Sequence, residues 1–112
     1  MNKFIIFAFN GNPMCFVHVL LNALDMDGKG MDAKIVIEGE AVKLVREMEE
    51  SGNILYKKAK EKGLIDCICK ACSAKMGVLD YNKTVGIPLG EDMNGHPSMA
   101  TYMDKGYQII TL

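Results

Sequence analysis

An uninterrupted apolar run at residues 4–9, Phe-Ile-Ile-Phe-Ala-Phe, constrains the fold more than any other feature of this chain. Such a run, rich in aromatic and β-branched side chains, predicts a strand covered on both faces, as in a parallel sheet between helices. Asn12 and Pro13 follow as a helix N-cap and a first helical residue. The run is too short for a membrane-spanning helix or a signal-peptide core, so we expect a soluble, cytoplasmic protein without a membrane partner.

The alternation of strand and helix patterns continues to the C-terminus. Residues 78–94 hold several Gly, Pro and Asn residues and predict a loop with a short helical turn. A length of 112 residues suits one domain over residues 1–112. The pattern predicts an α/β domain with a mostly parallel, doubly wound sheet of four or five strands. Further strands are predicted at residues 33–38, 64–68 and 107–112, and helices at residues 13–27, 41–50, 54–62, 69–76 and 96–105.

Charge and glycine spacing argue against two classes of function. The formal net charge of -1 gives no electrostatic reason to bind a polyanion, so we expect no direct nucleic-acid partner. The turn from Asn10 to Pro13 lacks the G-x-G-x-x-G spacing of dinucleotide-binding proteins, and we expect no cofactor.

Three of the four cysteines lie within six residues, at Cys67, Cys69 and Cys72, and Cys15 stands apart. Without an export signal these are expected to be reduced thiols. Cys69 falls where the third strand joins a helix, so unpaired backbone N–H groups and the helix dipole should lower its pKa. The thiolate would then be a nucleophile. The alternative is that Cys69 is a small buried core residue.

Other side chains gain a role if they lie near Cys69. With strand order 2-1-3, Asn10 and Cys15 would share its edge of the sheet. Cys72 lies on the same helix face, as a resolving thiol, a second sulfur acceptor or a packing residue. His96 begins the last predicted helix, where it either contacts a ligand or caps the helix. Cys67, two residues before Cys69, is expected on the same face and is interpreted as packing.

A metal site is the competing interpretation. Cys67, Cys69, Cys72 and His96 could supply four zinc ligands. A buried strand-to-helix run does not form the small free loop of a zinc knuckle, so zinc ranks second and no metal ligand is assigned. His18, in the middle of an apolar helix, is expected to be a packed, hydrogen-bonded histidine.

The segment Ile68 to Val78 resembles the cysteine segment of the DsrE/DsrF-like family, which includes the TusD sulfur-relay subunits. In that family a cysteine at the end of the third strand precedes a small-residue helix and a Gly-hydrophobic pair, and only Cys69 has the right distance to Gly77. The resemblance extends to the first strand, to residues 38–42 and to residues 95–112. It implies a flavodoxin-like, three-layer α/β/α fold and homo-oligomers, either trimers or hexamers.

The resemblance also implies a function. Cys69 would carry sulfur as a persulfide between a donor protein and an acceptor protein. From their predicted positions, and not from the resemblance, the candidate auxiliary residues are Cys72, Cys15, His96 and Asn10. The first hypothesis is therefore a cytoplasmic sulfur carrier, a sulfurtransferase-like protein in a persulfide relay. The alternative is a non-catalytic oligomeric module that binds a small ligand or a metal such as zinc.

Overall fold

A computed structural model describes residues 2–112 and contains one five-stranded sheet in which every strand pair is parallel. The strand order is β4-β3-β2-β1-β5. The α/β class and the parallel sheet are thereby confirmed. The strands are β1 (Lys3–Ala8), β2 (Asp32–Ile37), β3 (Ile65–Cys69), β4 (Leu89–Gly90) and β5 (Gln108–Thr111).

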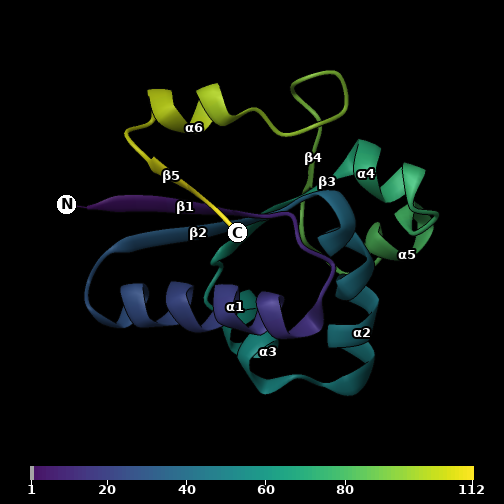
Figure 1. Cartoon of the computed structure of the whole chain (residues 1–112), viewed down its shortest axis with the longest axis horizontal. Coiled ribbons are helices and arrows are strands. Elements are labelled where there is room, and N and C mark those ends of the chain that lie inside the picture. The colour runs from purple at the N-terminus through teal and green to yellow at the C-terminus, as the bar shows by residue number, and fades with distance from the viewer. Residues whose placement is uncertain (1) are drawn as a thin grey trace.

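Helices cover both faces of the sheet in three layers, consistent with a flavodoxin-like architecture. Figure 1 shows α6 on one side of the sheet and α1 with α3 on the other. From β1 to β4 each strand lies beside its predecessor, so right-handed crossovers keep the intervening helices on one face. The return from β4 to β5 places α6 on the opposite face. The helices are α1 (Pro13–Gly28), the 3₁₀ helix η1 (Gly39–Lys43), α2 (Leu44–Ser51), α3 (Ile54–Glu61), α4 (Lys70–Lys75), α5 (Leu79–Asn82) and α6 (Met99–Asp104).

Local capping residues set the helix boundaries. The Asn12 side chain accepts a hydrogen bond from the Met14 N–H at 2.8 Å, and Pro13 is the first residue of α1. This start of α1 is as predicted. Gly52 ends α2 in the left-handed conformation, with φ of 64°. The Asn53 side chain then caps α3.

Each face of the sheet has its own apolar core. The larger cluster joins Ile6, Ile35 and Ile37 of the sheet to α1, α2 and α3. The smaller cluster packs Ile5 and Phe7 under α6. Burial of a large apolar side chain contributes about 1.5–3 kcal/mol, so both clusters hold the sheet between its helices.

The pairing of β2 with β3 contains a bulge. Ile35 pairs with Ile65, but the next residue of β2, Val36, pairs with Cys67. Asp66 is the extra residue on β3. The bulge directs the Cys67 side chain to the smaller core, where it packs with Val36.

Several expectations need correction. The strand order 2-1-3 is wrong, because β2 lies between β1 and β3, and the order reverses between β1 and β5. The last helix begins at Met99 rather than His96, and Ser98 is its N-cap. The predicted loop over residues 78–94 contains the expected short helical turn, α5, and also a strand that was not predicted, β4. His18 is exposed and not packed. No helix within residues 2–112 is both long and apolar enough to cross a membrane.

Candidate functional site

The carboxyl ends of β2 and β3 meet at one place on the edge of the sheet. Ile37 pairs with Ile68, so the residues that follow them, Glu38 and Cys69, come next to each other. Glu38 leads into η1 and Cys69 leads into α4. Two chemically active side chains are therefore positioned by parallel strand pairing alone.

Cys69 is both the last residue of β3 and the N-cap of α4. Its Sγ accepts a hydrogen bond from the Cys72 N–H at 3.4 Å. The residue is 0% exposed. The expected fall in its pKa is wrong: burial raises the pKa of the Cys69 thiol well above its ordinary value, and the Cys72 N–H offsets this only in part.

Four donor atoms converge above the strand ends. His96 Nδ1 lies 3.1 Å from Cys69 Sγ and 3.7 Å from Cys72 Sγ. Glu38 Oε1 accepts a hydrogen bond from the Cys72 thiol at 3.5 Å and lies 3.7 Å from His96 Nδ1. All four atoms lie within 4.8 Å of one another. We call Glu38, Cys69, Cys72 and His96 the thiol cluster.

The thiol cluster has a closed side and an open side. Glu38 is only 7% exposed, and Cys69 is sealed beneath it. Cys72 is half-buried, and the His96 side chain is 40% exposed. A reagent or ion therefore reaches the cluster past His96 and Cys72.

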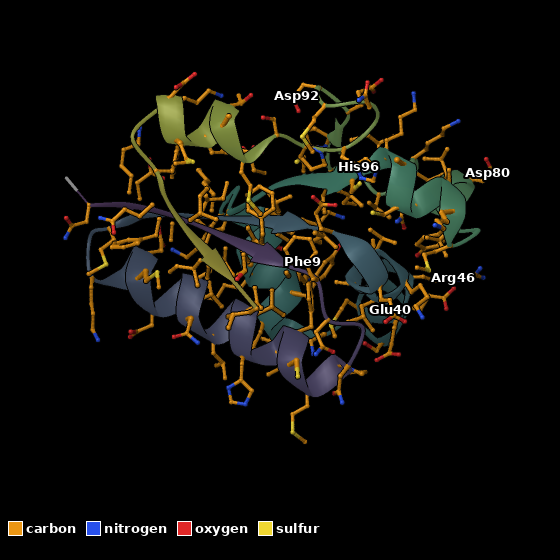
Figure 2. All side chains as sticks on the ribbon, turned by 45° about the horizontal axis from the view of Figure 1, so that its top comes forward. Phe9, Glu40, Arg46, Asp80, Asp92 and His96 are labelled. Carbon is orange, nitrogen blue, oxygen red and sulfur yellow. The ribbon has the colours of Figure 1, made fainter. Side chains whose placement is uncertain are left out.

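A tight turn presents His96. Met93 and His96 exchange two backbone hydrogen bonds, of 2.7 and 2.9 Å, around Asn94 and Gly95. Both turn residues have positive φ, 51° and 90°, as the Asn-Gly pair of a type I′ turn requires. The Gly95 carbonyl accepts the Ala71 N–H at 2.8 Å, which joins the turn to the start of α4. Figure 2 shows His96 beside α4.

Asp92 fixes the same loop to α6. Its carboxylate accepts the Ser98 N–H at 3.0 Å and the Thr101 hydroxyl at 2.8 Å. The hydrogen bond from Thr101 contributes most, and with the one from Ser98 it holds the pKa of Asp92 below its usual range. The loop that carries His96 is therefore held to α4 through the Gly95 carbonyl and to the start of α6 through Asp92.

A buried polar network supports the thiol cluster from below. Ser73 donates a hydrogen bond to the Cys69 carbonyl at 2.8 Å. The Asn82 amide donates to Ser73 Oγ at 3.0 Å and to the Val42 carbonyl at 3.1 Å. The network connects η1, α4 and α5, which fixes Cys69 and Cys72 relative to Glu38.

The remaining predicted site residues lie elsewhere. Cys67 is buried on the α6 face with its Sγ 3.4 Å from the Tyr102 hydroxyl, so it does not share a core with Cys69. Burial raises the pKa of Cys67 to about 11. Cys15 is exposed in the first turn of α1. Asn10 is exposed and accepts the Asn12 N–H.

Sequence reasoning missed Glu38 as a site residue. The available signal was a carboxylate directly after an apolar strand, Ile35 to Ile37. That signal has meaning only when β2 is known to neighbour β3, and the order 2-1-3 separated these strands.

The arrangement supports two kinds of chemistry. Two thiols beside an imidazole can exchange sulfur, because a thiolate attacks a disulfide or persulfide sulfur. Thiolates, an imidazole nitrogen and a carboxylate oxygen are also the ligands that Zn²⁺ takes in proteins. Both uses require the groups that lie close together here, and neither requires Cys67.

Comparison with known proteins finds relatives in archaea. Over 116 residues the chain is 32% identical to the uncharacterized protein MJ0733 of Methanocaldococcus jannaschii, which covers 97% of this chain and 93% of that protein. An uncharacterized protein of Archaeoglobus fulgidus is 36% identical over 55 residues, which cover 49% of this chain and 88% of that protein. No family model and no solved structure matches the chain.

Proposed function

The chain belongs to the same family as protein MJ0733 of Methanocaldococcus jannaschii, and we propose that it is a cytoplasmic sulfur carrier in which Cys69 holds sulfur as a persulfide. The observation that carries this proposal is the position of Cys69 Sγ. It accepts the Cys72 N–H at the start of α4 and lies 3.1 Å from His96 Nδ1. The resemblance of residues 68–78 to the DsrE/DsrF-like family supports the same role.

The transfer is a pair of thiol exchange steps. His96 Nδ1 is within reach of the Cys69 proton, and the resulting thiolate attacks the outer sulfur of a donor persulfide. A bond forms between Cys69 Sγ and that sulfur, the donor S–S bond breaks, and the donor leaves as a thiolate. In the second step an acceptor thiolate attacks the same outer sulfur, and Cys69 leaves as a thiolate. No electrons enter or leave the system.

Burial of Cys69 sets how a donor reaches it. The thiol is 0% exposed, and His96 and Cys72 lie between it and the surface. The donor approaches once the half-exposed His96 side chain rotates away. A persulfide on Cys69 extends by one S–S bond, about 2.05 Å, toward the open side, where an acceptor thiol meets the outer sulfur.

Cys72 lies within reach of the inner sulfur. All four donor atoms are within 4.8 Å, so a Cys72 thiolate can attack Cys69 Sγ of the persulfide, form a Cys69–Cys72 disulfide and release hydrosulfide. Cys72→Ser removes this exit. The persulfide of that variant should therefore last longer than the wild-type persulfide.

Intact mass measurement tests the proposal. The protein is incubated with a protein persulfide donor, and a gain of one sulfur atom is expected in the wild type. The gain should disappear in Cys69→Ser and persist in Cys67→Ser, the matched control with a thiol that is also buried and lies two residues away. Cys15→Ser should also gain sulfur. A wild type that gains no sulfur, or a Cys69→Ser variant that gains as much, would remove the proposal.

The proposal includes a homo-oligomer, a trimer or hexamer, that exchanges sulfur with donor and acceptor proteins. Large apolar side chains on the surface favour self-association. Light scattering of the purified protein measures the number of chains, and a monomer at all concentrations would contradict this part. The exposed side chains include Met14, Leu21, Ile54, Met103 and Leu112.

A further inference from the structure

We propose that the thiol cluster is a binding site for one Zn²⁺ ion. The ligand atoms are Glu38 Oε1, Cys69 Sγ, Cys72 Sγ and His96 Nδ1, which come from three separate segments of the chain. The set differs from the zinc ligands considered from the sequence, because Glu38 takes the place of Cys67.

The distances between the four ligand atoms fit a tetrahedrally coordinated ion. Zn–S bonds of about 2.3 Å and Zn–N or Zn–O bonds of about 2.0–2.2 Å place tetrahedral ligand atoms about 3.3–3.8 Å apart. Four of the six pairs are 3.1, 3.5, 3.7 and 3.7 Å apart, and no pair exceeds 4.8 Å. These four separations lie within about 0.2 Å of the tetrahedral range.

The ligand types select the ion. Two sulfur atoms and an imidazole favour Zn²⁺ over Mg²⁺ or Ca²⁺, which prefer sites made only of oxygen. Four protein ligands fill a tetrahedral shell and leave no position for a reacting water, as in structural zinc sites. The geometry points to an ion that holds the two thiols in place, keeps them unreactive and does not hydrolyse a substrate.

The surrounding structure already holds the ligands in place. The type I′ turn and the Gly95 carbonyl position His96, and the bulge-adjusted pairing of β3 positions Cys69 beside Glu38. Gly39 has φ of 53° and lets η1 begin directly after Glu38. A free knuckle loop is unnecessary, because the fold brings three rigid segments together.

Glu38 adds an independent reason for a cation. A carboxylate that is 7% exposed is costly to bury unless a positive charge or good hydrogen-bond donors face it. The groups that face its Oε1 include two thiols, which are weak donors, with Cys72 Sγ at 3.5 Å, and His96 Nδ1 at 3.7 Å. A Zn²⁺ ion at the centre of the thiol cluster supplies the missing charge.

The site also regulates sulfur transfer, a consequence that rests on the proposed function. Zinc coordination and persulfide formation both use the Cys69 thiolate, and a zinc-bound thiolate is a weaker nucleophile than a free one. The ion and the outer sulfur therefore compete for Cys69 Sγ. Bound Zn²⁺ would keep the thiols reduced and unreactive until a donor protein or a chelator removes it.

Cobalt titration of the full chain tests the site. Co²⁺ replaces Zn²⁺ in such sites and gives a thiolate-to-metal absorption band, which we expect to saturate at one ion per chain and to vanish when Zn²⁺ is added. Cys72→Ser should lose about half of the band, because one of two thiolates is gone. Glu38→Gln and His96→Ala should weaken Zn²⁺ affinity at least about tenfold.

Matched controls lie outside the thiol cluster. Cys67→Ser and His18→Ala should leave both the absorption band and the affinity unchanged, since neither side chain reaches the cluster. The zinc site is overturned if no stoichiometric band forms in the wild type. It is also overturned if Cys67→Ser reduces the band as much as Cys72→Ser.

The two proposals can fail separately. Metal binding without any sulfur gain by mass removes the carrier and leaves the zinc site standing. Sulfur gain without metal binding removes the zinc site and leaves the sulfur carrier standing. When both occur, the rate of sulfur gain should fall at least about tenfold on adding one equivalent of Zn²⁺, and an unchanged rate would refute the competition between them.

Discussion

Cys67 and Cys69 are two residues apart and both buried, yet their side chains face different groups. Burial raises the pKa of both thiols. Cys67 faces the Tyr102 hydroxyl under α6, whereas Cys69 faces a second thiol, an imidazole and a carboxylate. Burial alone therefore does not distinguish a core cysteine from a functional one. The convergence of other reactive groups does.

Substitutions on the Cys67 side of the sheet should change stability without changing the chemistry of the thiol cluster, whereas substitutions beside Cys69 should change both. Alkylation of Cys72 followed by peptide mapping reports on the geometry of the thiol cluster independently of sulfur or metal. Chemical unfolding reports on stability.

The largest expected effect is that of Tyr102→Ala on the Cys67 side. The Tyr102 ring packs edge-on against Phe7 with centroids 5.7 Å apart, and its hydroxyl donates to Asp66 at 2.5 Å. Loss of this aromatic should lower the free energy of unfolding by about 3–5 kcal/mol, measured by urea denaturation. Cys72 alkylation in the folded protein should stay at the wild-type rate.

Tyr102→Phe is the milder companion, because it keeps the ring and removes only the hydroxyl. Its expected cost is about 1 kcal/mol. If either variant, while still folded, changed Cys72 alkylation substantially, the two sides of the sheet would not be independent.

A smaller effect is expected for Gly95→Ala on the Cys69 side. Gly95 has φ of 90°, and an added Cβ would lie 3.1 Å from the Ala71 Cβ. We expect a loss of about 1–2 kcal/mol and faster alkylation of Cys69 and Cys72, since the turn that carries His96 would move. Gly28→Ala is the control, because its Cβ would meet open space and its φ is not positive. Equal behaviour of the two variants would contradict the role of the turn.

The smallest effect concerns pH and Asp92. Its pKa is lowered in the folded protein, so its contribution to stability is present above the ordinary value of about 3.9 and is lost as the pH falls below it. Because the carboxylate is exposed, the contribution should be below about 1 kcal/mol. The difference in unfolding free energy between wild type and Asp92→Asn should be smaller at pH 3 than at pH 7. A difference that grows on acidification would be inconsistent with these hydrogen bonds.

Local features of the fold could be predicted because they depend on neighbouring residues. The Asn12 cap, the start of α1 at Pro13 and the join at Cys69 follow from side chains within one turn of the boundary. The apolar runs identified four strands and the parallel class. The two-residue β4 was missed, because Leu89 and Gly90 carry no periodic pattern.

The remaining errors have a common cause. Strand order depends on which helices pack on which face, and no single segment encodes that choice. The position of Glu38 beside Cys69 follows only from that order. His96 was assigned to a helix because Pro97 is a common helix-start residue, but the Asn94-Gly95 pair formed a turn instead.

Asp66 acts as one inserted residue in β3, and it shifts the later residues of that strand by one position relative to β2. If Asp66 paired with Val36 in regular register, Cys67 would stand beside Ile37, and Ile68 would take the position next to Glu38. A strand of the same length without the bulge would therefore place an aliphatic side chain where the thiol is needed. Among related chains that keep this strand length, the bulge and the position of the cysteine should occur together.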